Sequence, residues 1–271
     1  MKLLDGQNLD DIAIALLRQY EPQALELNPA GYWLAYSGGK DSDVILDLAK
    51  RSGIKFTAHY NMTTADPPEL VHYIRRQHPE VKIERHKSMW QLIREHHCPP
   101  RRAARFCCQE LKECGGSGHI IITGIRNAES PRRAKRRQFE ACYRDGRKFY
   151  LNPIKAWPTS AVWAYIRGRK LPYCRLYDEG FKRIGCVLCP MTRNVQEQID
   201  RWPKLAAAWR RAIVSTFKPG YCGRTGKAFK SEEDYWQWWL DRDASIDDYS
   251  EPDDMVLFED DPDQKEAVGN G

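Results

Sequence analysis

The sequence S-G-G-K-D-S at residues 37–42 constrains the fold more than any other part of this chain. It follows an apolar run at Tyr32–Tyr36 with strand character and precedes a run at Asp43–Lys50 with the apolar spacing of a helix. Two glycines at a strand-to-helix turn allow a sharp bend and bring bare backbone N–H groups close to a ligand. The helix N-terminus adds further donors and the positive end of the helix dipole, so this turn is predicted to bind an anion. The spacing differs from G-x-x-x-x-G-K-[ST], so a Walker-type ATPase or kinase is not expected.

The first half of the chain alternates between strand-like and helical segments. A helix is expected over residues 8–20, ahead of the first strand. The strand-like runs are Tyr32–Tyr36, Lys55–Tyr60, Val81–Arg85 and His119–Thr123, and the helical runs between them are Asp43–Arg51, Pro68–Gln77 and Met89–His96. Because strands that alternate with helices form parallel sheets, we predict an α/β fold whose open parallel sheet carries helices on both faces. The glycine turn then lies at the carboxyl edge of the sheet, where such folds bind ligands.

The pattern changes near residue 150, and three segments are predicted. Residues 1–150 are expected to form the α/β domain, including the N-terminal helix. Residues 151–240 are expected to form a helical, loop-rich extension with a helix at Thr159–Gly168 and many tryptophans. Residues 241–271 carry many acidic and few large apolar side chains, so a partly disordered acidic tail is expected.

Charge and composition narrow the choice of partners. The net charge is +6, and residues 126–148 contain a dense group of Lys and Arg. This basic block favours an anionic partner, either a nucleotide or a nucleic-acid backbone, and a solvated face is the alternative. No apolar run approaches the ~18 residues that span a bilayer, so a cytoplasmic protein without membrane association is expected. There the nine cysteines would be reduced, which favours metal binding or thiol chemistry over disulfides.

Four of the cysteines form two close pairs. Cys107 and Cys108 are adjacent, and Cys186 and Cys189 form a C-x-x-C sequence. Adjacent cysteines suit a mononuclear zinc site poorly, because its ligands are usually two to four residues apart. Two neighbours can contact different irons of a larger cluster, so we predict a [4Fe–4S] cluster on these four cysteines. The alternatives that stay open are a zinc site, a three-cysteine variant of the cluster, and buried thiols without a metal, with Cys114 and Cys174 as the substitute ligands.

Several segments together resemble the phosphoadenosine phosphosulfate (PAPS) and adenosine phosphosulfate (APS) reductase family, in its iron–sulfur branch. The resemblance covers roughly residues 30–192. S-G-G-K-D-S is similar to the PP-loop of the ATP pyrophosphatase superfamily, to which this family belongs. The other matching segments are Asn61–Glu69, the G-x-R sequence at 124–126, Asn152–Trp163 (with Ala161 in place of an acid) and Leu171–Cys189.

The resemblance implies an adenine nucleotide alpha hydrolase-like PP-loop fold and a site for an adenine nucleotide. The residues that it places against the nucleotide and its phosphates are Ser37, Gly38, Gly39, Lys40, Asp41, Ser42, Gly124, Arg126, Ser130 and Arg133. Lys40 is expected to offset the negative charge that develops in catalysis, and Asp41 to hold part of a Mg²⁺ ion.

One departure from the family bears on the activity. The reductases carry a catalytic cysteine in a C-terminal Glu-Cys-Gly-Leu-His segment, whereas the last cysteine here, Cys222, has different neighbours. Because sulfonucleotide reduction needs that nucleophile, we expect ATP-dependent adenylylation coupled to sulfur transfer onto a nucleic acid. The PP-loop component of DNA phosphorothioation systems is a similar enzyme, and a sulfur donor or reductant protein would be a partner. A PAPS or APS reductase and a non-catalytic nucleotide- or DNA-binding module are the alternatives.

Overall fold

The computed structural model describes residues 8–219, 229–241 and 243. The chain divides into two compact units, the first made of residues 1–92 and 100–206 and the second of residues 93–99 and 207–271. All of the residues predicted to bind nucleotide or metal belong to the first unit. The three predicted segments stay a prediction, and Cys222 and nearly all of the acidic tail lie outside the described residues.

A six-stranded sheet organises the first unit, with the strand order β3-β2-β1-β4-β6-β5. Every neighbouring pair is parallel except β5 and β6, which form an antiparallel hairpin. The predicted α/β fold with an open and mostly parallel sheet is therefore confirmed. The strands are β1 (Tyr32–Ala35), β2 (Phe56–Met62), β3 (Lys82–Arg85), β4 (Ile120–Ile122), β5 (Phe139–Cys142) and β6 (Asp145–Leu151).

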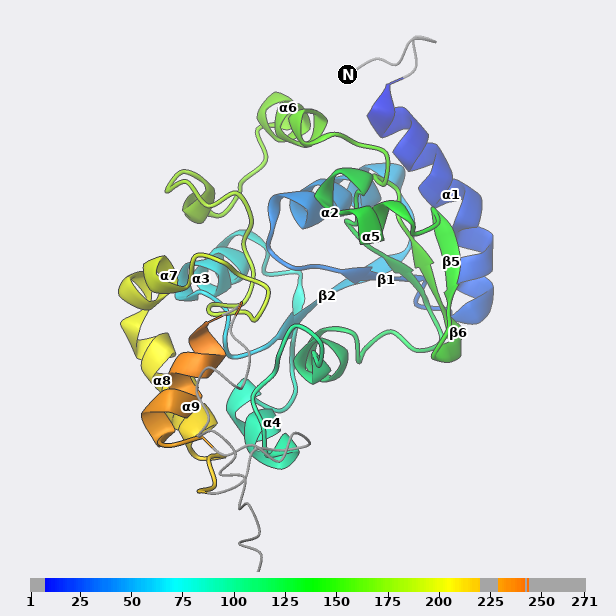
Figure 1. The fold of residues 1–271 in the computed structure, drawn as a ribbon. Helices are drawn as coiled ribbons and strands as arrows, with labels where there is room; N and C mark the ends of the chain where they lie inside the picture. The colour runs from blue at the N-terminus through cyan, green and yellow to red at the C-terminus, as the bar shows by residue number, and fades with distance from the viewer. Residues whose placement is uncertain (1–7, 220–228, 242, 244–271) are drawn as a thin grey trace, which may run out of the picture. The chain divides into compact units, whose positions relative to one another are not determined.

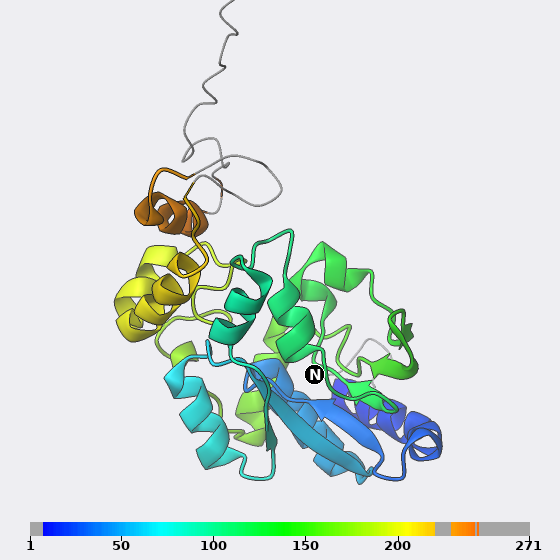
Figure 2. The same cartoon turned by 90° about the horizontal axis from the view of Figure 1, so that it is seen from below.

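Helices cover the sheet on both sides. Figure 1 shows α2 between β1 and α6, while the short π-helix η1 packs against β2 on the other side. In both views α3 lies on the β3 side of the sheet, and α1 lies on the side of the β5–β6 hairpin (Figures 1 and 2). The bounds are α1 (Leu9–Leu27), α2 (Lys40–Ser52), α3 (Pro68–Gln77), α4 (Met89–His96), η1 (Cys108–Lys112), η2 (Asn127–Glu129), α5 (Pro131–Ala134), α6 (Thr159–Arg169), η3 (Arg175–Tyr177), α7 (Val195–Arg201), α8 (Pro203–Val214) and α9 (Glu232–Leu240).

The side chains of β1 show why both faces of the sheet are covered. Tyr32 and Leu34 are fully buried, and the Tyr32 hydroxyl donates to the carbonyl of Leu17 on α1 at 2.6 Å. Trp33 points to the opposite face, because side chains alternate along a strand, and its ring stacks on His59 of β2. A strand that is apolar on both faces is typical of a parallel sheet between two layers.

The second unit has a tryptophan core of its own. Trp209 of α8 stacks on Trp239 of α9 with ring centroids 4.9 Å apart, and Trp236 stacks on Trp239 at 5.5 Å. Trp238 is also buried and contacts Phe229. The tryptophans of α9 are thus core residues, as their helical spacing indicates. Within the described ranges, every helix is too short or too polar to span a lipid bilayer.

The first turn of α2 contains a buried carboxyl group, that of Asp43. Asp43 accepts a hydrogen bond from the Tyr36 hydroxyl at 2.5 Å, and the His78 ring lies 3.6 Å from the same oxygen. Its second oxygen has no hydrogen-bond partner among the described residues. Burial raises the pKa of Asp43 to about 8, although the hydrogen bond from Tyr36 acts in the opposite direction. We therefore expect Asp43 to be protonated in the folded protein at neutral pH.

The free energy of unfolding is expected to fall as the pH rises from about 5 to about 7. In this window the folded chain keeps the Asp43 proton, whereas the unfolded chain, with an ordinary carboxyl pKa, loses it. The unfolded state then binds fewer protons, so this group contributes a slope of up to about −1.4 kcal/mol per pH unit. Asp43→Asn, which mimics the protonated group, should remove that contribution in urea unfolding at pH 5, 6 and 7. A stability difference between the two proteins that does not change with pH would contradict this assignment.

Candidate nucleotide-binding site

The glycine turn lies at the carboxyl edge of the sheet, where the direction of strand connection reverses. From β1 the chain passes through α2 to β2 on one side, and β4 later adds to β1 on the other side. Open α/β sheets bind ligands at such a switch point. The turn connects Ala35, the last residue of β1, with Lys40, the first residue of α2.

Gly38 is required by both the backbone and the packing of this turn. Its φ is +72°, a left-handed conformation that L-residues rarely adopt. A Cβ at this position would lie 2.6 Å from Leu70 Cδ1 and 2.8 Å from Ile74 Cδ1, both on α3. The turn thus packs closely against α3, which fixes the conformation of its backbone.

Gly38→Ala is expected to destabilise the fold by about 2–3 kcal/mol, because strain at positive φ adds to the clash with α3. Gly53 provides a matched control, since its φ is +74° but a Cβ there would meet nothing within 4 Å. Gly53→Ala should therefore cost only about 1 kcal/mol. Urea unfolding of the two variants measures the difference, and equal losses would mean that the contact with α3 is unimportant.

A group of three charged side chains lies at the start of α2. Lys40 Nζ is 2.8 Å from Asp41 Oδ2, and Arg126 Nε is 2.6 Å from Asp41 Oδ1. All three side chains are largely buried, with Arg126 only 2% exposed. Asp41 thus holds two cations at the N-terminus of α2, an arrangement suited to a polyphosphate.

The loop after β4 holds Arg126 in place. Its guanidinium donates to the carbonyl of Trp157 at 3.1 Å and to Thr159 Oγ1 at 3.3 Å, at the start of α6. Gly124 lets this loop approach α2, since a Cβ there would lie 3.2 Å from Asp41. In this structure Arg126 is directed at Asp41, so its predicted contact with a nucleotide anion stays a prediction.

Ser130 and Arg133 interact with each other and with Glu129. The Ser130 hydroxyl accepts from the Arg133 N–H and caps α5, and the Arg133 side chain pairs with Glu129. Glu129 also accepts from the backbone N–H of Arg126 at 3.0 Å. The two residues are thus connected to Arg126 through Glu129, and their predicted role at a phosphate is untested.

Tyr177 joins the site although the pattern of residue types did not single it out. Its hydroxyl accepts a hydrogen bond from the Lys40 N–H at 3.0 Å, and its ring lies 5.8 Å from Lys40 Nζ. A Cβ on Gly39 would be 3.3 Å from the same hydroxyl. Tyr177 therefore covers the turn and occupies one of the donors at the N-terminus of α2. The sequence signal was its place in the Leu171–Cys189 segment.

The two cysteine pairs come together, although 78 residues separate Cys108 from Cys186. Cys107 hydrogen-bonds to Cys108 and lies within electrostatic range of Cys186 and Cys189. The C-x-x-C loop is docked onto the end of β2, where the Val187 N–H donates to the Ala65 carbonyl at 2.8 Å. All eight described cysteines are free thiols. In the described part of the chain, no group of three Cys, His, Asp or Glu side chains is arranged to hold a metal ion.

Negative charge is favoured on one of these sulfurs, Cys108, whereas burial raises the pKa of Cys186. The hydrogen bond from Cys107 lowers the pKa of Cys108 to about 6, and Lys112 and Arg105 act in the same direction. The hydrogen bond to Cys108, burial and the neighbouring sulfurs raise the pKa of Cys107. Thr63 Oγ1 lies 3.3 Å from Cys186 Sγ, and the negative charges of Cys186 and Asp66 raise the pKa of Lys112. Lys112 is thus one of the cationic neighbours of the cysteines.

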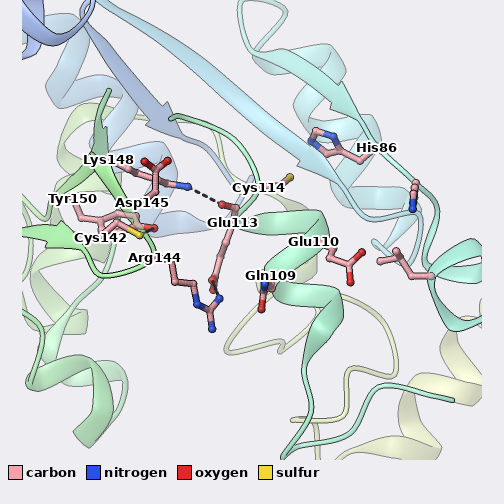
Figure 3. A pocket seen from close by; sticks show the side chains of 12 residues that line it. His86, Gln109, Glu110, Glu113, Cys114, Cys142, Arg144, Asp145, Lys148 and Tyr150 are labelled. Carbon is pink, nitrogen blue, oxygen red and sulfur yellow. Dashed lines mark hydrogen bonds and ion pairs between the residues drawn. The ribbon is translucent and has the colours of Figure 1, made fainter. Parts of the chain in front are cut away.

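A separate pocket of about 540 Å³ lies between η1 and the β5–β6 hairpin (Figure 3). Its lining includes Gln109, Cys142 and Arg144, but neither the residues of the glycine turn nor the four clustered cysteines. Lys148 closes one side, because its ammonium donates to the carbonyls of Glu113 at 2.7 Å and Gly115 at 2.6 Å. The buried charges of Lys40, Asp41 and Arg126 lie at the glycine turn and not in this pocket.

The fold and the glycine turn at its switch point define an α/β domain of the nucleotide-binding PP-loop class. Residues 31–192 match the phosphoadenosine phosphosulfate reductase domain, and this chain belongs to that family. The resemblance deduced from the sequence is confirmed.

The chain is also similar to individual proteins of this kind. It is 30% identical over 196 residues to the uncharacterized protein MJ0066 of Methanocaldococcus jannaschii, covering 66% of this chain but only 41% of that relative. It is 27% identical over 190 residues to the adenosine 5'-phosphosulfate reductase of Allochromatium vinosum, covering 62% of this chain and 72% of the reductase. Among solved structures, the phosphate complex of PAPS reductase from Candida auris has a TM-score of 0.48 at 18% identity, covering 69% of this chain and 96% of that one.

Proposed function

We propose that this chain is an ATP-dependent PP-loop enzyme that adenylylates an acceptor oxygen on a nucleic acid and so prepares it for sulfur transfer. The observation that supports this most is the group formed by Lys40, Asp41 and Arg126 at the N-terminus of α2. It combines a movable ammonium group, a carboxylate and fixed backbone donors at one ligand-binding edge.

In the proposed reaction the acceptor oxygen attacks the α-phosphorus of ATP. The bond from that phosphorus to the bridging oxygen breaks, and pyrophosphate leaves with its electrons. Lys40 would turn from Asp41 to the phosphate oxygens and offset the charge of the leaving group. Asp41 Oδ2, released by Lys40, is our candidate for a Mg²⁺ ligand, while Arg126 keeps Oδ1 in position. Hydrosulfide, or a persulfide whose S–S bond a thiol of the donor then cleaves to form a disulfide, would displace AMP together with the acceptor oxygen.

The four cysteines have the chemistry of iron–sulfur ligands, although the described thiols are not arranged to hold a metal ion. One pair lies at the start of η1 and the other in the C-x-x-C loop, and Lys112 and Arg105 would balance the negative charge of their thiolates. We propose that Cys107, Cys108, Cys186 and Cys189 hold a [4Fe–4S] cluster, which would supply electron transfer when bound. Cys174 and Cys114 lie elsewhere, the former beside Asp43 and Glu69 and the latter beside Lys148.

The similarity to the A. vinosum enzyme favours a second candidate, the reduction of a sulfonucleotide to sulfite. Binding and product assays on protein purified without oxygen separate the two. Our proposal predicts that ATP binds more tightly than APS or PAPS, and that no sulfite appears when APS or PAPS is supplied with a thiol. Preferential binding of APS or PAPS together with thiol-dependent sulfite release would replace it by the reductase.

A further inference from the structure

An aromatic ring stands at the tip of the β5–β6 hairpin. Tyr143 is 86% exposed, the largest exposure among the exposed large apolar side chains of the described residues. It occupies the two-residue turn between Cys142, which ends β5, and Asp145, which begins β6. The guanidinium of its neighbour Arg144 lies 5.0 Å from the centre of the ring. A tyrosine this exposed, with a cation beside its ring, is not explained by core packing.

The nine cations of the basic block divide into two sets. Four are used inside the fold: Arg126 on Asp41, Arg133 on Glu129, Arg136 on Glu140, and Lys148 on the carbonyls of Glu113 and Gly115. The other five are exposed, and of these only Arg144 has an ion-pair neighbour in the described chain, Glu113 at 3.9 Å. The exposed set is Arg132, Lys135, Arg137, Arg144 and Arg147.

These five cations border the edge strand β5 from one end to the other. Arg132 belongs to α5, and Arg137 lies at the carboxyl edge, where its carbonyl accepts from Asn152, the residue after β6. Arg144 and Arg147 lie at the opposite edge, where β6 begins. The four residues of β5 alone extend over roughly 14 Å. The cations thus form a band that starts beside the nucleotide-binding edge and ends at Tyr143.

We propose that this band binds a single-stranded segment of a nucleic acid. Arg132, Lys135, Arg137 and Arg147 would contact phosphates, and an unpaired base would stack on Tyr143 with Arg144 beside it. Cations on an edge strand can also serve to prevent pairing with another sheet. That purpose does not explain an exposed aromatic ring, whereas stacking of bases on tyrosine is the usual companion of a basic groove. The proposal rests on the nucleic-acid acceptor of the proposed function and identifies where it binds.

The test measures binding of a labelled 20-nucleotide single strand, as DNA and as RNA, by fluorescence anisotropy without ATP. Tyr143→Ala is expected to weaken binding roughly 5- to 100-fold, and Tyr143→Phe to retain it, because the ring and not the hydroxyl is used. Arg137→Gln with Arg147→Gln should lower the slope of log affinity against log salt by about 0.7 per residue. Lys82→Gln, an exposed cation on the opposite edge strand β3, is the matched control and should change nothing.

Three outcomes would overturn the proposal. They are absence of binding at low salt, equal affinity of Tyr143→Ala and the wild type, and equally effective competition by polyglutamate, which would indicate an acidic protein partner. The result is independent of the proposed reaction, because ATP is left out. If the protein binds the strand but does not cleave ATP, the proposed adenylylation is wrong and the proposed binding surface stands. If it cleaves ATP but Tyr143→Ala binds the strand as tightly as the wild type, the binding surface is wrong and the adenylylation stands.

Discussion

Lys40→Met is expected to reduce pyrophosphate release from ATP by about 10²- to 10³-fold, with little change in stability. The side chain is nearly buried, and methionine keeps its length and apolar stem while removing the ammonium. The loss follows from removing a fixed positive charge at the site where the leaving group becomes negative, an effect of this size for a single donor. Asp41 keeps its ion pair with Arg126 in the variant, so no buried charge is left without a partner.

Lys50→Met is the matched control for this experiment. Lys50 belongs to the last turn of the same helix, is half exposed, and pairs with Glu80 at 2.5 Å. Surface pairs of this kind contribute at most about 1 kcal/mol to stability, so the variant should stay folded. Because Lys50 lies at the other end of α2 from the glycine turn, the rate of pyrophosphate release should be unchanged. If Lys40→Met released pyrophosphate within threefold of the wild type, the catalytic role of Lys40 would be wrong.

Cys186→Ser is expected to lose nearly all of the iron that the wild type binds, about four atoms per chain for a [4Fe–4S] cluster. Serine is nearly isosteric with cysteine but provides no thiolate, and Cys186 lies in the docked loop that faces Cys107. The measurement is iron and labile sulfide in protein purified without oxygen, together with the visible absorption of the sample.

Cys114→Ser serves as the control, because Cys114 is exposed and lies apart from the two pairs. It should retain the iron and the colour of the wild type. Loss of iron in Cys114→Ser, or retention in Cys186→Ser, would mean that the ligand set is different. A colourless wild type loaded with zinc would contradict the cluster itself.

The strands β1, β2 and β4 could be predicted because each is a short run rich in apolar and aromatic residues, and β3 because Val81 and Ile83 alternate with charged residues. The β5–β6 hairpin was not predicted, because its strands carry Glu140, Arg147 and Lys148 among their apolar residues. A hairpin at a sheet edge needs few apolar side chains, so charged residues interrupt the alternation of apolar and polar residues that would indicate a strand. The first helix was predicted to end at residue 20 but continues to Leu27 through Pro22, which the local pattern does not indicate.

The glycine turn could be predicted because its chemistry is encoded in six consecutive residues. The contacts that complete it could not, since they join residues far apart in the sequence. Tyr177 lies 137 positions after Lys40, and Arg126 lies 85 positions after Asp41. The sequence did not show which cations of the basic block are paired inside the fold, and the structure pairs four of them. Only tertiary structure separates those cations from the exposed ones.

The most direct test of the account is to identify the products of ATP made by the anaerobically purified protein with Mg²⁺ and candidate nucleic acids. We predict AMP and pyrophosphate in equal amounts, in a reaction that Lys40→Met abolishes and Lys50→Met does not. ADP and phosphate as the products would contradict cleavage between the α and β phosphates. No turnover of ATP, with sulfite formed from APS or PAPS instead, would show that this PP-loop serves sulfonucleotide reduction.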